Sequence, residues 1–311
     1  MDLKIPERAK LLQVETNTIC NGGCTFCRYG TMKKRREMPL HQIIDILYHL
    51  GHKVNEVFPF YMQEPFLEPR LLPILSNVKL YNPRGQCTLY SNMSRFPEAT
   101  IKKIIQWGLV DMVVASVYGG NKQVHDQMQP GVPYAKAKSN IKKFVKLRDS
   151  LGWIRPKIML AYLVTKDTLP NLKKAIKEWS SILPVAVFRW DSWCGHFPYD
   201  AEWEEQFWGP PETRQPCRQL WTGIYINSDG DLLPCCMDCD AEMVVGNVFD
   251  DWDVWWNSEK LNEMRMLHLE GRWDEIPMCS KCTKWRWHEE IGKWVQGWTK
   301  KIEVAPCAVN R

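Results

Sequence analysis

The chain has 311 residues, 45% of them hydrophobic, and a formal net charge of +5. These values are ordinary for a globular protein, and the length predicts one large domain with a smaller one beside it. The modest positive charge fits an anionic cofactor or substrate and gives no reason to expect a nucleic acid as partner. No apolar run approaches the roughly 20 residues that span a bilayer, and no apolar signal segment opens the chain. We therefore expect a cytoplasmic protein without a membrane partner.

Strand-like and helix-like segments alternate over the first two thirds of the chain. Apolar or β-rich runs predict six strands, at residues 11–15, 54–62, 87–90, 111–116, 157–164 and 185–190. Between them, apolar side chains recur at helical spacing, as Ile43, Leu47 and Leu50 do before Gly51. Repeated strand–helix units predict parallel strands joined by right-handed crossovers. Six such strands fit a partial barrel as well as an open sheet.

A cysteine motif follows the first predicted strand. Cys20, Cys24 and Cys27 have the spacing C-x3-C-x2-C. A 4Fe–4S cluster takes four ligands, usually four thiolates. Three thiols in one short loop suit three irons and leave the fourth open to a small molecule. A structural zinc site and three unrelated thiols are the alternatives, although zinc favours paired C-x2-C or Cys/His sets.

Polar residues follow the next three predicted strands, at 62–65, 90–92 and 116–120. Ligands gather at the carboxyl ends of the strands in parallel α/β folds, so these loops would meet the cysteine motif there. For each loop the alternative is an ordinary connection without a binding role. Arg189 and Asp191, at the end of the sixth strand, would share one face and orient a polar substrate. Their alternative is a solvated salt bridge.

The last third of the chain is rich in cysteine and tryptophan. Cys217, Cys235, Cys279 and Cys282 form the pattern C-x12-G-x4-C, a gap, then C-x2-C. Its glycine, Gly230, predicts a hairpin turn between two short strands. Four thiols suit a second iron–sulfur cluster or a zinc ion. Residues 209–211, Gly-Pro-Pro, predict a boundary between domains at 1–209 and 210–311, the second ending in a helix over 284–298.

These motifs together resemble the radical S-adenosylmethionine (radical SAM) superfamily. The resemblance covers residues 10–290 and is closest to members with a twitch extension, the shortened form of the SPASM domain, a class that includes the butirosin-pathway aminocyclitol dehydrogenase. It implies an α/β fold: a partial (β/α)6 barrel with a small α+β twitch extension at the C-terminus. In this family SAM chelates the open iron and is reductively cleaved to a 5′-deoxyadenosyl radical.

The resemblance also implies roles for individual residues. The SAM-binding 4Fe–4S cluster would be held by Cys20, Cys24 and Cys27, and the auxiliary 4Fe–4S cluster by Cys217, Cys235, Cys279 and Cys282. SAM would contact Phe26, Gln63, Glu64, Asn92 and Ser116. The family's Gly-Gly-Glu-Pro stretch is matched here only by Glu64 and Pro65, so Gln63 or the local backbone would bind the SAM amino group. The remaining candidates are Cys194, Cys236 and Cys239 as hydrogen-atom donors, or as bystanders, and Arg189 and Asp191 as substrate contacts.

In the family the radical removes a hydrogen atom from an unactivated carbon, and the next step decides the reaction. Oxidation through the auxiliary cluster would give a ketone, hydrogen return from a thiol would invert the carbon, and bond formation would indicate a ribosomal peptide. No leader-peptide recognition pattern precedes residue 11, so we expect a small polar substrate such as a sugar or aminocyclitol. A flavodoxin- or ferredoxin-type protein would supply electrons. A non-catalytic iron–sulfur or zinc protein is the alternative from a different class.

Overall fold

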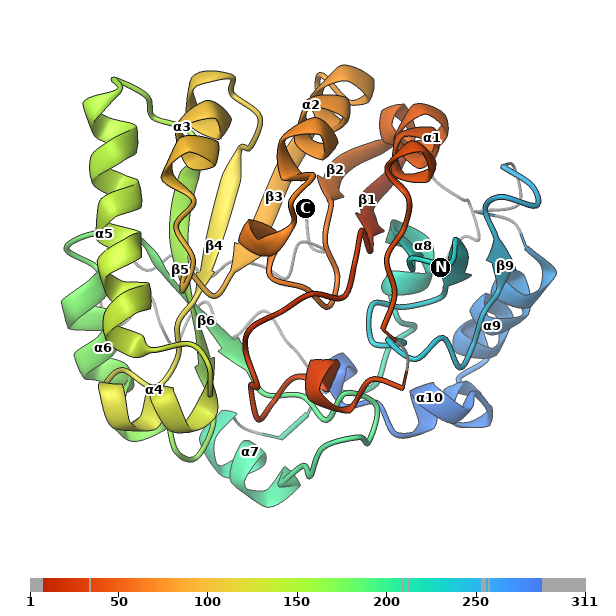
Figure 1. The fold of residues 1–311 in the computed structure, drawn as a ribbon. Coiled ribbons are helices and arrows are strands. Elements are labelled where there is room, and N and C mark those ends of the chain that lie inside the picture. The colour runs from red at the N-terminus through yellow and green to blue at the C-terminus, as the bar shows by residue number, and fades with distance from the viewer. Residues whose placement is uncertain are drawn as a thin grey trace.

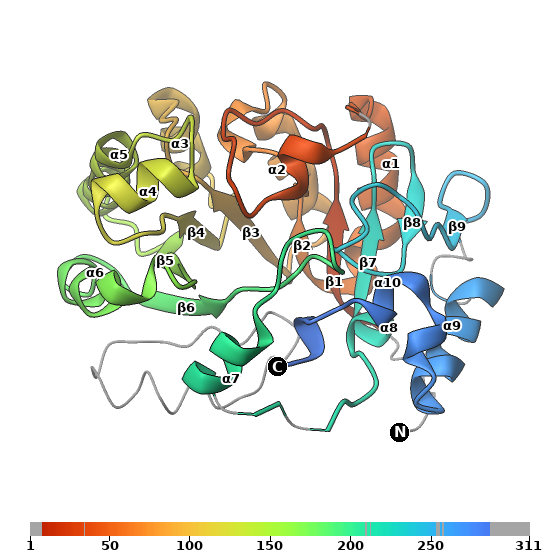
Figure 2. The same ribbon diagram turned by 90° about the horizontal axis from the view of Figure 1, so that it is seen from below.

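The computed structural model describes residues 8–33, 35–208, 210–211, 213–252, 256 and 258–286. Its strands form one nine-stranded sheet in the order β6-β5-β4-β3-β2-β1-β7-β8-β9. Strands β1 to β6 pair in parallel. Their bounds are Ala9–Val14, Val54–Phe58, Gln86–Ser91, Met112–Ser116, Lys157–Val164 and Val185–Arg189. Figure 2 shows the strands as an open arc with β6 at one end and β9 at the other.

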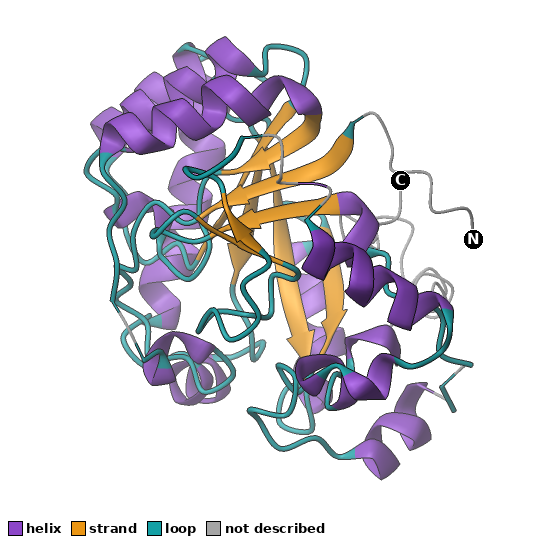
Figure 3. Cartoon of the chain, turned by 90° about the vertical axis from the view of Figure 1, so that its right-hand side faces the viewer, coloured by secondary structure: helices purple, strands orange, loops and turns teal. Residues whose placement is uncertain are grey.

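Helices connect the parallel strands and cover the outer face of the arc (Figures 1 and 3). They are α1 (Leu40–Leu50), α2 (Leu71–Tyr81), α3 (Glu98–Gln106), α4 (Lys122–Met128), α5 (Tyr134–Ser150) and α6 (Leu172–Trp179). The longer helices bury mainly apolar residues; α1, for example, buries Ile43, Ile46, Leu47 and Leu50, whereas the short α4 buries His125 and Met128. The unclosed sheet with outer helices is the partial barrel expected from the sequence, and that prediction of the fold class is confirmed.

The C-terminal extension continues the same sheet. Helix α7 (Ala201–Trp208) follows β6, and the extension after it comprises α8 (Gln219–Thr222), β7 (Gly223–Ile226), β8 (Asp231–Leu233), β9 (Gly246–Asn247), α9 (Glu259–Leu269) and α10 (Pro277–Ser280). Strand β7 lies parallel to β1, with Ile224 opposite Leu12, and turns back antiparallel into β8. The turn contains Gly230 at φ +83°, where a Cβ would lie 2.4 Å from the Phe249 ring. This is the predicted hairpin.

Two other expectations concern the ends of the extension. The domain boundary at residue 209 stays a prediction. Of the helix predicted over 284–298, Lys284–Arg286 form a short 3-10 turn, and the rest lies outside the described residues. Within the described part of the chain, every helix is too short or too polar to cross a membrane.

Candidate functional site

The cysteine motif lies in the loop that leaves β1 at its carboxyl end. A Cβ on Gly22 would lie 3.3 Å from the Cys24 Sγ and 3.7 Å from the Cys20 Sγ, so both thiols face the same side of this residue. Backbone amides point at the sulfurs: Gly22 N–H donates to Cys20 (3.3 Å), and Tyr29 N–H donates to Cys27 (3.4 Å). Such N–H···S contacts are one way in which a protein stabilises iron–sulfur clusters and sets their potentials.

The raised pKa values of Cys24 and Cys27 indicate that thiolates at these positions would need a positively charged group between them. Burial, and then the neighbouring thiolates of Cys27 and Cys20, raise the pKa of Cys24 to about 12. Burial likewise raises the pKa of Cys27 to about 12, and Cys20 adds to the shift. Three buried thiolates would repel one another, and bound iron would remove this cost. The donor set therefore fits a cluster with three protein ligands.

Loops from neighbouring strands hold the cysteine loop in place. The Asn21 side chain donates to Ser94 Oγ (2.9 Å) and to the Gly131 carbonyl (2.8 Å). Gly23 N–H donates to the Pro130 carbonyl at 2.7 Å. Gly131 has φ +83°, and a Cβ there would lie 2.2 Å from the Asn21 carbonyl oxygen. Only glycine allows this close approach of the two loops.

Glu64 joins the loops that follow β2 and β3. Its buried carboxylate accepts hydrogen bonds from Ser91 Oγ (2.7 Å), Asn92 N–H (2.7 Å) and Phe66 N–H (3.1 Å). Burial raises its pKa to about 6, although these three bonds act in the opposite direction. Asn92 in turn donates from Nδ2 to Asn21 Oδ1 (3.3 Å). Glu64 thus positions Asn92 against the cysteine loop, and we propose that it affects SAM through Asn92.

The other candidates for SAM contact, Gln63, Ser116 and Phe26, also lie near the carboxyl ends of the strands, but they differ in how deeply they are buried. The Gln63 amide donates to Thr16 Oγ1 (2.6 Å) and accepts Asn17 N–H (3.3 Å), so it lies beneath the loop. Ser116 is half-buried at the end of β4. Phe26 reaches two strand ends: its ring packs edge-on against Tyr118 at 5.0 Å and Trp190 at 6.4 Å between centroids. Their contacts with SAM stay predictions.

Gln129 belongs to this site and carries no sequence signal. Its buried amide donates to the Ser116 carbonyl (3.1 Å), accepts Tyr118 N–H (3.2 Å) and lies 3.9 Å from the Cys24 Sγ. It therefore links a cysteine of the motif to the end of β4. No spacing rule singles out a glutamine in the segment between α4 and α5.

We expect Glu64→Gln and Asn92→Ala each to weaken SAM binding roughly tenfold while leaving the iron content unchanged. Removing a partner from a buried hydrogen bond costs about 1–3 kcal/mol, and neither residue is a thiol ligand. Calorimetry with SAM and iron analysis of the same samples would measure both effects. Glu263→Gln, an exposed position on α9, is the matched control. Unchanged affinity in both variants would remove these loops from the SAM site.

A second group of cysteines gathers where the loop after β6 meets the extension. Their thiols interact with one another electrostatically, and the group comprises Cys194, Cys217, Cys235, Cys236, Cys279 and Cys282. Burial, with neighbouring thiolates, raises the pKa of Cys217 and Cys279 to about 12. Met237 N–H donates to Cys235 (3.5 Å) and Lys284 N–H to Cys282 (3.4 Å). Four of the six are the predicted auxiliary ligands.

These thiols are not arranged around one ion. Among the residues that the structure describes, no three Cys, His, Asp or Glu side chains converge as ligands of a single metal ion. A 4Fe–4S cluster binds its four thiolates to four different irons and so spreads them further apart. The number and type of the donors fit such a cluster.

His268 connects two members of this group and belongs to no sequence motif. Its Nδ1 accepts Cys217 N–H (3.2 Å), and its Nε2 lies 3.5 Å from the Cys279 Sγ. Burial, then Arg214, lowers its pKa to about 4. The ring is therefore neutral, and with Nδ1 accepting, the proton is on Nε2 and points at the sulfur.

The two substrate candidates after β6 have partners within the chain. Arg189 is buried, donates from Nε to Glu204 of α7 (3.0 Å) and from Nη1 to the Arg286 carbonyl (2.8 Å). Arg189 thus forms a buried ion pair with Glu204, unlike the solvated bridge of the alternative, and its role toward the substrate stays a prediction. Asp191 accepts Trp193 N–H (2.8 Å) and raises the pKa of Cys194 after larger effects of Cys282 and burial. Its substrate role stays a prediction.

The third spare thiol, Cys239, lies beside the first cysteine motif. It interacts electrostatically with Cys27 of the first motif and accepts a hydrogen bond from Arg28. Arg28 also pairs with Asp240, which accepts Lys33 N–H (3.0 Å). Residues 235–242 thus run from the second cysteine group to the first.

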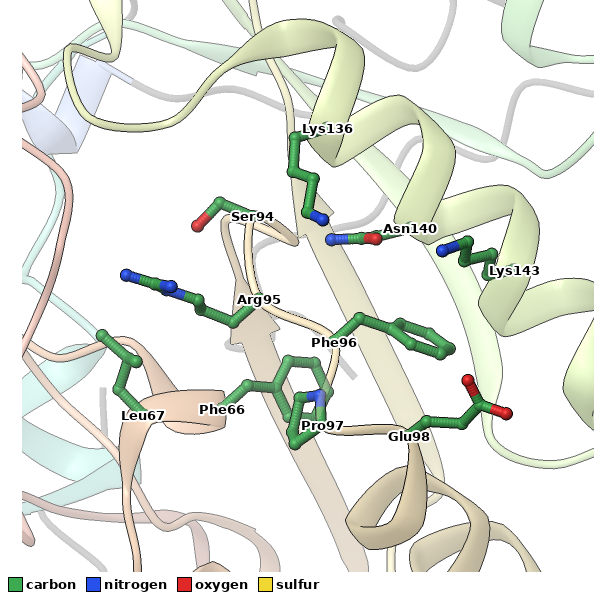
Figure 4. Close-up of a pocket in the computed structure, with 10 residues that line it drawn as sticks. All are labelled: Phe66, Leu67, Ser94, Arg95, Phe96, Pro97, Glu98, Lys136, Asn140 and Lys143. Atoms are coloured by element: carbon green, nitrogen blue, oxygen red, sulfur yellow. The ribbon is translucent and has the colours of Figure 1, made fainter.

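Two cavities flank these groups. One, of about 390 Å³, lies between the loop after β3 and α5, and Figure 4 shows Arg95, Lys136 and Lys143 around it with Glu98 at one end. Ser94 lines this cavity and also accepts the bond from Asn21. The other, of about 430 Å³, is lined in part by Cys282.

Two family models match the chain. The model of the radical SAM superfamily matches residues 14–159, and the SPASM model, an iron–sulfur cluster-binding domain, matches residues 217–283. The first match contains the three-cysteine motif and the second all four predicted auxiliary ligands. Of the second cysteine group, five members lie within the SPASM match and Cys194 lies outside it.

Two characterised proteins are similar in sequence. The ribosomal RNA large subunit methyltransferase Cfr of Lachnoclostridium phytofermentans is 40% identical over 60 residues, 18% of this chain and 17% of that protein. This chain therefore matches only about a sixth of it. The S-adenosyl-L-methionine-dependent 2-deoxy-scyllo-inosamine dehydrogenase of Niallia circulans is 21% identical over 282 residues, 88% of this chain and 92% of that protein.

Solved structures share the fold. The crystal structure of BtrN in complex with AdoMet and 2-DOIA matches with a TM-score of 0.59 and 17% identity, covering 88% of this chain and 93% of that one. Streptococcus suis SuiB bound to the precursor peptide SuiA matches with a TM-score of 0.67 and 15% identity, covering 99% and 77%. At these identities the likeness shows a common fold.

Proposed function

We propose, from the premise that this chain belongs to the radical SAM superfamily and carries a SPASM iron–sulfur domain, that it oxidises a small polar substrate such as a sugar or aminocyclitol. The enzyme binds 4Fe–4S clusters and SAM. With both matches in place, the alternatives of a zinc protein and a non-catalytic binding protein are set aside. The substrate and the reaction type are the parts that we propose.

The observation that carries the proposal is the second cysteine group at the end of β6. A dehydrogenase of this kind needs an electron acceptor beside the substrate, and the loop with Asp191 and Cys194 joins the barrel mouth to the auxiliary cysteines. The relative from Niallia circulans, aligned over 88% of this chain, is named as a dehydrogenase of an aminocyclitol. Both point to oxidation of a hydroxyl carbon.

We assign the binding roles as follows. Cys20, Cys24 and Cys27 hold the first cluster, which with SAM supplies a 5′-deoxyadenosyl radical. Phe26, packed between Tyr118 and Trp190, forms an aromatic wall that keeps water from the reacting carbon. Asp191 orients the substrate hydroxyl.

The proposed reaction balances without a further oxidant. Cys217, Cys235, Cys279 and Cys282 would hold the auxiliary cluster, which would supply a one-electron acceptor. The substrate carbon would give up one hydrogen atom, recovered in 5′-deoxyadenosine. The hydroxyl proton would go to solvent and the remaining electron to that acceptor, so that C–OH would become C=O. A flavodoxin- or ferredoxin-type protein remains our prediction for the reductant that cleaves SAM.

Epimerisation is the second candidate, and Cys239 is the thiol that favours it. Cys194 and Cys236 contact predicted auxiliary ligands, whereas Cys239 lies beside Cys27 and Arg28 in the SAM-cluster loop. A thiol that returns hydrogen to a substrate radical belongs near the site where that radical forms. Modification of a ribosomal peptide is the third candidate; SuiB, which shares the fold, is bound to a precursor peptide in its crystal structure.

Deuterated substrates would decide among these reactions. We expect a deuterium-labelled sugar or aminocyclitol to transfer its label to 5′-deoxyadenosine and to give a product lacking two hydrogens, by mass spectrometry. Cys239→Ala should retain this turnover. A product that keeps all its hydrogens and carries deuterium from deuterated water would instead establish epimerisation, and Cys239→Ala should then cleave SAM without inverting the carbon. Label transfer only from peptides would overturn the small-molecule assignment.

A further inference from the structure

The second cysteine group has two thiols more than a cubane needs. Hydrogen bonds between side chains join its members in two pairs, Cys194 with Cys282 and Cys235 with Cys236. Cys217 and Cys279 complete the group, each interacting electrostatically with Cys282. The Cys279 sulfur lies against His268.

The pairing reduces six thiols to four ligand positions. A 4Fe–4S cluster binds each thiolate to a different iron, so its ligand sulfurs stand apart at four corners. Two thiols in hydrogen-bond contact occupy one corner and offer a choice of ligand for one iron. Two pairs and two single thiols therefore define the four corners of one cluster.

The backbone holds Cys194 at its corner in a conformation that costs energy. Trp193 and Cys194 have φ of +46° and +55°, and Gly195 follows at +88°. A non-glycine residue in this left-handed region is uncommon, and two in succession persist only where surrounding contacts impose them. The strain therefore has to be offset by contacts that reach this turn.

Those contacts come from the loop that carries Cys282. Ser192 N–H donates to Thr283 Oγ1 (2.8 Å), and Ser192 Oγ donates to the Lys281 carbonyl (3.2 Å). A Cβ on Gly195 would lie 3.0 Å from the Lys281 Cβ, so the two backbones approach closely. Residues on both sides of Cys282 are thus bonded to the turn that presents the Cys194 thiol.

We propose that Cys194, on the barrel loop after β6, is an alternative ligand for the auxiliary-cluster iron that Cys282 binds. The cluster is then held by the barrel as well as by the extension. The inference rests on the presence of the auxiliary cluster and is independent of the substrate proposed above. The competing role for Cys194 is a thiol that only donates a hydrogen bond to Cys282.

Iron content distinguishes the two roles without measuring turnover. After anaerobic reconstitution, the wild type should hold about eight irons in two cubanes. Cys194→Ala and Cys282→Ala should each keep about eight, because the other thiol takes the vacant iron. The double variant should fall to about four, as should Cys279→Ala, the matched control whose contact is a histidine. Electron paramagnetic resonance of reduced Cys282→Ala should retain two cluster signals.

The double variant also needs a test of folding. Retention of about four irons in the first cluster, together with SAM binding measured by calorimetry, would show that its barrel is folded. Loss of about four irons in Cys282→Ala alone, as in Cys279→Ala, would overturn the proposal in favour of the hydrogen-bonding role. Retention of all iron in the double variant would overturn it as well, because neither thiol would be a ligand. Zinc in the second site of the wild type would refute the auxiliary cluster itself, whereas the oxidation is tested separately by its products.

Discussion

Cys24→Ala is expected to abolish 5′-deoxyadenosine formation. Cys24 is the middle thiol of the C-x3-C-x2-C motif, its sulfur faces the same side of Gly22 as that of Cys20, and the loop has no spare thiol in sequence. Its loss leaves the first cluster with two thiolates from the motif, too few to hold a cubane with one open iron. The effect is measured by incubating the variant with SAM and a reductant and quantifying 5′-deoxyadenosine by chromatography.

The control for Cys24→Ala is Cys87→Ala, since Cys87 is buried in β3 as part of the core. It should keep both 5′-deoxyadenosine formation and iron, at some cost in stability. Replacing Cys20, Cys24 and Cys27 together should leave about four irons per chain, those of the auxiliary cluster. Activity at the wild-type level in Cys24→Ala would contradict the assignment of the motif to the SAM cluster.

Arg189→Met is expected to lower the free energy of unfolding by about 3–5 kcal/mol, because it leaves Glu204 charged and unpaired in a buried position. Arg189 joins the end of β6 to α7 and, through the Arg286 carbonyl, to the region after the last auxiliary cysteine. Denaturant unfolding of the protein, kept anaerobic with its clusters loaded, measures the loss.

The double variant Arg189→Met/Glu204→Leu separates this structural role from substrate binding. Replacing both partners of a buried ion pair with apolar residues is often nearly neutral, so the double variant should regain most of the lost stability. If Arg189 acts only through its ion pair, the double variant should also regain the ability to oxidise the substrate. A stable double variant that cleaves SAM but no longer oxidises the substrate would support the predicted role of Arg189 in substrate binding.

The order and type of the barrel elements follow from the sequence, and the departures have local causes. Residues 54–62 predict one strand, whereas β2 ends at Phe58. Pro59 comes next, and proline has no N–H to donate to the ladder. The apolar residues Phe60 and Met62 are nonetheless buried, packed in the loop rather than in the sheet. Hydrophobicity therefore indicates burial there but not strand structure.

The cysteines of the site could be found from spacing, but their surroundings could not. Gln129 lies 105 residues from Cys24 along the chain, and His268 lies 51 from Cys217. Neither belongs to a motif, because each acts through one tertiary contact. The partner of Arg189 was missed for the same reason: the strand pattern points to Asp191, two residues away, while α7 brings Glu204 against the guanidinium.

The parallel pairing of β7 with β1 determines how a truncated form of the protein should behave. Without the extension, β1 would become an edge strand, exposing backbone donors and acceptors now paired with residues 223–226. Its neighbouring side chains Leu11, Leu12 and Val14 are apolar and buried, and unprotected edges of this kind recruit other chains. A fragment ending near residue 209 should therefore self-associate during expression, and the extension serves as the barrel's protection against aggregation as well as a carrier of iron.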